Sequence, residues 1–197
     1  MFVHLKTKTI YSLLEGAIFS KALADQCRKF KMPAVGIADR ANLFGALEFS
    51  EVLSDNGIQP IIGCQVPISF KEADLKKLRV TDRLSMIFLA TNELGYRNLM
   101  ELSSKFFLND TYRFEGMSIR EIDKFSNGLI CLSGGDESPI NNLLGDNKIK
   151  EAENFLLHFK RKFGDRFYLE MNRHPLGDNY SKKVNIEDNI LDLADKH

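Results

Sequence analysis

Short apolar runs rich in β-branched residues alternate along the chain with longer stretches of helical periodicity. This alternation is typical of βα units around a mainly parallel sheet, and it predicts an α/β fold. The runs that predict strands are Phe2 to Leu5, Ala34 to Ala38, Pro60 to Val66, Met86 to Ala90, Leu129 to Leu132 and Phe167 to Met171.

The stretches between these runs predict helices. Ser118 is followed three residues later by Glu121, the spacing of a capping box, and predicts a short helix over Ser118 to Phe125. Ser12 and Glu15 have the same spacing and are a second capping-box candidate. The charged segment Lys71 to Asp82 lacks periodicity and fits either a surface loop or a short helix. The other predicted helices cover Ala17 to Lys31, Leu43 to Asp55, Leu94 to Phe106, and the apolar faces that begin at Ile149 and Ile186.

No internal repeat and no Gly/Ser-rich linker divides the 197 residues, so residues 1–197 are expected to form one domain. The last helical pattern runs to His197 without a Gly or Pro stop, although a helix in a βα array usually leads into another strand. We therefore expect that the fold is truncated before its last βα elements.

Composition narrows the classes of function. The 27 basic and 27 acidic side chains give a formal net charge of zero, which argues against a protein that coats nucleic acid. No apolar run approaches the roughly 20 residues that a membrane span needs, so we expect a cytoplasmic protein with no membrane contact. Cys27, Cys64 and Cys131 are widely spaced in apolar surroundings, and we expect all three in the core.

Candidate functional side chains follow the predicted strands, because functional groups in parallel α/β folds gather at the carboxyl ends of the strands. Lys6 and Lys8 follow the first strand, and their spacing of two places both side chains on one face. Three cations face at least two carboxylates there, which favours ion pairs over a metal site, although a solvated charged face is the alternative. The other candidates at these ends are Glu15, Asp39, Arg40, Gln65, Gly135, Glu170 and His174.

Several motifs, in the same order, resemble the start of the bacterial replicative DNA polymerase III alpha subunit. The longest are Tyr11 to Ala17 and Leu89 to Leu99, which contains Gly-Tyr-Arg-Asn-Leu. The resemblance covers nearly the whole chain. Its other elements are Val3 to Leu5, Met32 to Ala34, Ala38-Asp39, Asn42 to Gly45, Ile61 to Cys64 and Leu129 to Gly134.

The resemblance identifies the chain with the polymerase and histidinol phosphatase (PHP) domain, which implies a distorted (β/α)7 barrel that holds metal ions and hydrolyses phosphoesters. This sequence departs from the ligand set that the family implies. Lys6 and Lys8 stand in place of two histidines, Arg40 in place of a third, and Gln65 in place of a glutamate. A protonated ammonium or guanidinium group offers no lone pair to a metal.

Three further positions complete this set. Gly135 stands where the family often has cysteine, and its side chain has no ligand atom. Glu15 replaces an aspartate and could still coordinate a metal, and His174 matches a family ligand. With its partner ligands lost, we expect His174 to be a surface or hydrogen-bonded histidine, and Asp39 to be an ion-pair partner rather than a catalytic base.

The resemblance therefore implies a catalytically silent PHP module of a replicative polymerase, with no catalytic residue, no metal and no cofactor in this segment. The parent chain would carry out DNA-directed DNA synthesis with Mg²⁺. The implied partners are the rest of the alpha chain, the proofreading exonuclease subunit, and DNA through the parent chain. Two alternatives remain open, a metal-dependent phosphoesterase with proofreading activity and a binding site for an anion such as pyrophosphate.

Overall fold

The computed structural model describes residues 2–69, 84–173 and 180–197, and in the helix at 180–196 it describes side chains from residue 186 onward. Two predictions lie outside these ranges, the surface segment Lys71 to Asp82 and the site residue His174. Everything below concerns the described residues.

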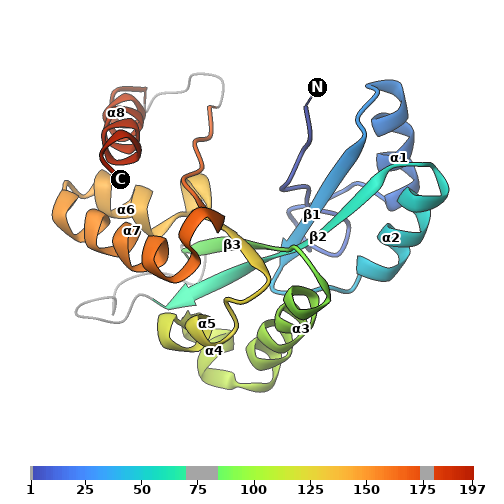
Figure 1. The fold of residues 1–197 in the computed structure, drawn as a ribbon, viewed down its shortest axis with the longest axis horizontal. Coiled ribbons are helices and arrows are strands. Elements are labelled where there is room, and N and C mark those ends of the chain that lie inside the picture. The colour runs from blue at the N-terminus through green and yellow to red at the C-terminus, as the bar shows by residue number, and fades with distance from the viewer. Residues whose placement is uncertain (1, 70–83, 174–179) are drawn as a thin grey trace.

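A mixed six-stranded sheet lies at the centre of the fold (Figure 1). Its main path has the order β1-β2-β3-β5-β6, and the short β4 pairs with the end of β2. β1 is parallel to β2 and β5 is parallel to β6, whereas β3 runs antiparallel to both of its neighbours. The strands are β1 (Ala34–Arg40), β2 (Gln59–Ser69), β3 (Ser85–Ala90), β4 (Met117–Ser118), β5 (Leu129–Leu132) and β6 (Phe167–Tyr168).

The prediction of a strand over Phe2 to Leu5 is wrong. Residues 4–7 lie beside β1, where Gly36 N donates to His4 O at 2.6 Å and Thr7 N donates to Gly36 O at 3.1 Å. These contacts leave only an isolated parallel bridge between Thr7 and Ile37, because the segment turns away before a continuous ladder forms. The last strand is also shorter than predicted and ends at Tyr168.

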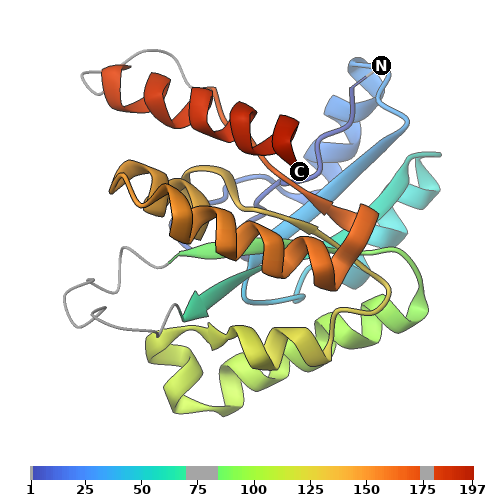
Figure 2. The same cartoon turned by 60° about the vertical axis from the view of Figure 1, so that its left-hand side comes forward.

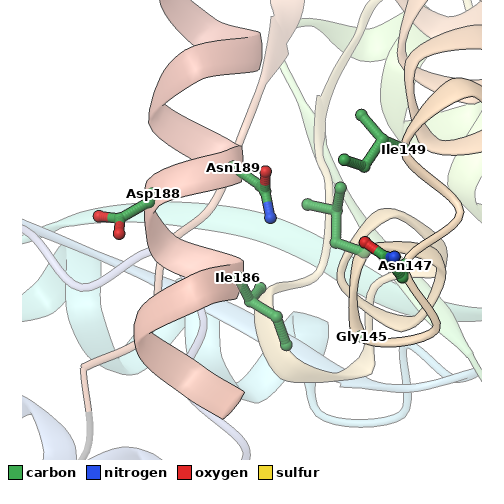
Figure 3. Close-up of a pocket in the computed structure, with 7 residues that line it drawn as sticks. Gly145, Asn147, Ile149, Ile186, Asp188 and Asn189 are labelled. Carbon is green, nitrogen blue, oxygen red and sulfur yellow. The ribbon is translucent and has the colours of Figure 1, made fainter. Parts of the chain in front are cut away.

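The helices cover the outside of this sheet. α1 packs on α2 near β1 and β2, and α6, α7 and α8 form a layer near β5 and β6 (Figures 1 and 2). The predicted cap of α5 is confirmed, since Ser118 Oγ accepts from Glu121 N at 3.3 Å. The helices are α1 (Ser20–Lys29), α2 (Ala46–Asp55), α3 (Glu93–Leu108), α4 (Asp110–Glu115), α5 (Ile119–Lys124), α6 (Pro139–Gly145), α7 (Ile149–Phe163) and α8 (Tyr180–Lys196).

The strands separate the apolar side chains onto two faces, as their period of two requires. On β3, Met86 and Phe88 pack toward the helices, whereas Ile87 and Leu89 point to the opposite face and meet Ala38 of β1. This second face leads to the edge of the sheet where the candidate site lies.

All three cysteines are free and buried, which confirms their predicted place in the core. Burial, with a smaller contribution from the charge of Asp39, raises the pKa of Cys64 to about 12. Burial also raises the pKa of Cys131 well above its usual value and raises that of Cys27. Among the helices that the structure describes, none is both long enough and apolar enough to cross a membrane.

Candidate functional site

Polar side chains gather at the edge of the sheet where β1 and β2 end. Arg40 and Gln65 are register partners in these parallel strands, so their side chains lie next to each other. Because β3 runs in the opposite direction, it contributes its first residue, Ser85, to this same edge. The site is therefore built from two strand ends and one strand beginning.

Arg40 and Lys8 share two carboxylates at this edge. The Arg40 guanidinium donates through Nε to Glu15 Oε1 at 2.5 Å and through Nη2 to Glu137 Oε2 at 2.7 Å. The Lys8 ammonium contacts the same two side chains, Glu15 Oε2 at 2.5 Å and Glu137 Oε1 at 3.5 Å. These four charges form a closed ring in which each cation contacts both anions.

Lys6 forms a further ion pair, with Glu170, which follows β6. Asn172 completes this part of the site: in the amide orientation that satisfies both neighbours, it donates to Glu170 Oε1 at 2.9 Å and accepts from Lys6 Nζ at 3.3 Å. The backbone N of Glu170 donates to Ser133 Oγ at 2.8 Å. We call the charged side chains at this edge the ionic cluster, which consists of Lys6, Lys8, Glu15, Arg40, Glu137 and Glu170.

Glu137 also joins the ionic cluster to two buried neutral groups. Its Oε2 accepts from Gln65 Nε2 at 2.7 Å and from Ser85 Oγ at 2.9 Å, and Gln65 Nε2 lies 2.6 Å from Ser85 Oγ. Gln65 is 3% exposed and Ser85 is fully buried. Glu137 belongs to the single 3-10 turn Gly135–Glu137 that follows β5.

Asp39 is not the ion-pair partner that the sequence predicted. Its carboxylate is 1% exposed and accepts from Thr9 N at 2.7 Å, Thr9 Oγ1 at 2.6 Å and Ser12 Oγ at 2.6 Å. Asp39 and Arg40 are adjacent in a strand, so their side chains leave opposite faces, and only Arg40 points to the ionic cluster. Asp39 instead anchors the loop that carries Lys8 and Glu15.

The predicted capping box at Ser12 and Glu15 is also wrong. Ser12 Oγ donates to Asp39 and accepts from Arg40 N at 3.1 Å, and Glu15 pairs with cations. The following helix, α1, begins only at Ser20. Both polar side chains are thus used to connect the loop to β1.

Gly135 lies under the amide of Asn172. A Cβ at this position would be 2.2 Å from Asn172 Nδ2, and the backbone φ of +61° also favours glycine. The close approach of Asn172 therefore explains why this position carries no side chain.

The charges in the ring shift one another's pKa values. Burial alone would raise the pKa of Glu15, but hydrogen bonds from Lys8 and Arg40 outweigh it and lower the value below 4.5. Burial likewise opposes ionisation of Glu137, and the charges of Arg40 and Lys8 together with the Ser85 hydrogen bond lower its pKa. The pKa of Arg40 is raised, since its bonds to the two glutamates outweigh the cost of burial. All three groups are therefore charged at neutral pH.

The structure brings together six of the predicted site residues, Lys6, Lys8, Glu15, Arg40, Gln65 and Gly135, and places Asp39 directly behind them. Sequence reasoning missed Glu137, Ser85 and Asn172. Glu137 lies five residues after a predicted strand, so a search for carboxylates beyond each strand end would have found it. Ser85 carried no such signal, because the apolar pattern does not reveal which way a strand runs.

The donor set does not suit a metal ion. Within residues 2–69, 84–173 and 186–197, no group of three or more His, Cys, Asp or Glu side chains is arranged to hold one. Each glutamate of the ionic cluster is already bound by at least one ammonium or guanidinium group. An incoming divalent cation would have to displace these internal cations.

Comparison with known proteins places this arrangement in a family. The sequence profile of the PHP domain matches residues 4–174, which include the ionic cluster and the whole sheet. The chain belongs to the PHP domain family. Its relatives include proteins named DNA polymerase III subunit alpha from Caulobacter vibrioides, 44% identical over 89% of this chain, and from Borreliella burgdorferi, 37% identical over 90%.

This PHP chain spans only about 15% of the length of the curated relatives that it matches. A structural comparison finds a Bifidobacterium adolescentis protein described as a metal-dependent phosphoesterase, with 20% identity and a TM-score of 0.41. That match covers 56% of this chain and 34% of the other, too little to support an argument about function.

Proposed function

We propose that this chain is the PHP module of a replicative DNA polymerase III alpha subunit, and that the module itself is catalytically silent. The observation that carries the first part is the 44% identity to an alpha subunit over 89% of the chain. The parent chain would carry out template-directed nucleotidyl transfer with Mg²⁺, through residues outside this sequence.

The chemistry of the ionic cluster supports the second part. The family resemblance implies metal ligands at Lys6, Lys8 and Arg40, but side chains that are protonated at neutral pH cannot donate a lone pair to a metal. Deprotonating a lysine that contacts a carboxylate would also forfeit a charge-assisted hydrogen bond. We therefore derive no hydrolytic step for this site and assign it no catalytic residue.

Several finer points belong to the same proposal. Residues 1–197 would form one PHP domain of the (β/α)7 barrel type in a cytoplasmic polymerase. The barrel assignment is supported by the contact between Lys6, beside β1, and Glu170, after β6, because these two residues lie at opposite ends of the main strand order. The module would support the polymerase body and dock the proofreading exonuclease subunit.

Two assays on one preparation test this proposal. A purified polymerase that carries this sequence should extend a primer on a DNA template in Mg²⁺. Elemental analysis of the PHP chain itself should find Zn, Mn and Fe well below one ion per chain. Absence of primer extension would contradict the polymerase assignment, and a stoichiometric metal would contradict the silent site.

A phosphodiesterase assay separates the silent module from a metal-dependent phosphoesterase. The PHP chain should not hydrolyse a chromogenic phosphodiester or 3′-labelled DNA in Mn²⁺. Turnover that requires Mn²⁺ and is lost in Glu15→Gln would overturn the proposal. Glu15 is a better choice for this test than Asp39, because the buried hydrogen bonds of Asp39 make its loss a test of folding.

A further inference from the structure

The carboxylate of Glu137 lies where donors from four parts of the chain converge. Its Oε2 accepts from Arg40 at the end of β1, from Gln65 in β2 and from Ser85 at the start of β3. Its Oε1 contacts Lys8 of the N-terminal segment at 3.5 Å. The three bonds to Oε2 are between 2.7 and 2.9 Å long, the range of well-formed hydrogen bonds.

These donors are held in place without help from Glu137. Arg40 and Gln65 are fixed by their strand register, and Arg40 is held from the other side by Glu15. The buried Gln65 amide also contacts the Ser85 hydroxyl. A guanidinium, an ammonium, an amide and a hydroxyl that converge on one point form the donor set that binds a carboxylate.

From this geometry we infer that Arg40, Lys8, Gln65 and Ser85 form a carboxylate-binding pocket that the chain fills with its own Glu137. The internal carboxylate ties the 3-10 turn after β5 to three strands and to the N-terminal segment. A metal centre would join these segments by placing anions around a cation, whereas this site places donors around an anion.

The inference explains why this PHP site needs no external ligand. While Glu137 occupies the pocket, Lys8 and Arg40 are neutralised by Glu137 and Glu15, and Lys6 is paired with Glu170. An added anion would meet these three carboxylates. Pyrophosphate should therefore not bind to the intact site, in contrast to the alternative that the sequence left open.

Formate provides a direct test, because it is a carboxylate small enough to enter the space that Glu137→Ala leaves. Thermal unfolding of wild type, Glu137→Ala and Glu93→Ala is compared in sodium formate and in sodium chloride of equal ionic strength. Glu93 is the matched control, since it is a glutamate paired with one arginine on the exposed surface of α3. This test needs only the folded PHP chain and is independent of polymerase activity.

We expect Glu137→Ala to unfold at a lower temperature than wild type in chloride, and formate to restore part of the loss in a saturable way. At ten times its dissociation constant, formate would raise the ratio of folded to unfolded chain about 11-fold. Wild type and Glu93→Ala should respond equally to the two salts. The double variant Glu137→Ala/Arg40→Gln should lose the formate response.

An equal response of Glu137→Ala to formate and chloride would overturn the inference, as would a formate response that survives Arg40→Gln. If Glu137→Ala does not fold in chloride, its refolding yield is measured in the two salts, and an equal failure in both counts against the pocket. Glu137→Gln then gives a second measure in a folded protein. Its amide has the shape of glutamate but no charge, so it should be less stable than wild type and insensitive to formate.

Discussion

Asp39 and Arg40 illustrate how neighbouring residues in one strand take separate tasks. The Asp39 carboxylate organises the loop of residues 9–12 through neutral donors, and the Arg40 side chain enters the ionic cluster. The family resemblance suggested one shared charged site for both residues. The alternation of side chains across the strand prevents this.

Replacing Asp39 with asparagine should destabilise the protein by about 1–3 kcal/mol, because one of its oxygens becomes an NH₂ group that faces a donor in a buried site. Urea unfolding monitored by circular dichroism measures the change. The control is Asp110→Asn, at an 86% exposed side chain that lies 3.8 Å from Arg113, and its effect should stay within about 0.5 kcal/mol. Equal effects of the two substitutions would contradict the structural role of Asp39.

Acid should weaken the ring of Lys8, Glu15, Arg40 and Glu137. The pKa values of Glu15 and Glu137 are lower in the folded chain than the ordinary 4.5, so the folded state binds fewer protons than the unfolded state at mildly acidic pH. Their stabilisation is complete above the unfolded pKa and is lost as the pH falls through the lower folded values.

The double variant Glu15→Gln/Glu137→Gln tests this pH dependence. The free energy of unfolding, measured from pH 7 to pH 3, should fall less steeply for the double variant than for wild type. Glu93→Gln, which removes an exposed carboxylate, serves as the control and should follow the wild-type curve. Parallel curves for all three proteins would show that the ring contributes nothing to acid sensitivity.

At the scale of elements, hydrophobic periodicity predicted where helices and strands occur better than how the strands are directed. α3, α7 and the capped α5 lie where the pattern placed them, since their apolar spacing and cap residues are local signals. The reversed β3 was not predicted, because its alternating side chains look the same in either direction. The candidate site was accordingly predicted as a set of strand ends and lacked Ser85.

The N-terminal segment was predicted poorly for a related reason. Its apolar residues resemble a strand, but hydrogen bonds to Asp39 and ion pairs at Lys6 and Lys8 determine its path. These contacts join residues that are distant in the sequence, and no local pattern signals them. Family resemblance located Lys6, Lys8 and Arg40, whereas Glu137 and Asn172 became apparent only from the packing.

The start of α3 depends on the absence of a side chain at Gly95. A Cβ there would lie 1.8 Å from the backbone oxygen of Gly128, so either the helix or the turn before β5 must move. Gly95→Ala should therefore destabilise the protein by more than about 1 kcal/mol, although alanine is favoured over glycine in helices by about that amount.

Ser104→Ala on the exposed face of the same helix is the control for Gly95→Ala. It also introduces alanine but meets no backbone atom, and it should change stability by no more than about 0.5 kcal/mol. Chemical denaturation of both variants gives the comparison. A Gly95→Ala protein as stable as wild type would contradict the close packing of α3 against Gly128.

Across the whole molecule, the pair of Lys6 and Glu170 joins residues 164 positions apart in the sequence. Lys6 lies beside β1, at one end of the main strand order, and Glu170 follows β6, at the other end. The contact therefore ties the first part of the sheet to the last.

A double-mutant cycle with Lys6→Ala and Glu170→Ala should give a coupling energy of about 1 kcal/mol or more, because both side chains are largely shielded from water. The surface pair Arg97 and Glu93 on α3 is the comparison and should give about 0.3–0.5 kcal/mol. Both cycles are measured by chemical denaturation. Additive effects at Lys6 and Glu170 would mean that the contact does not hold the sheet ends together.

The burial of all three cysteines makes the folded chain a convenient protein for site-specific chemistry. Because Cys27, Cys64 and Cys131 are free, buried and raised in pKa, they should react slowly with maleimides as long as the chain stays folded. A single cysteine introduced at a surface position would then take up a fluorophore or spin label selectively. Partner binding and domain motion could be followed in the natural background, without first removing native thiols.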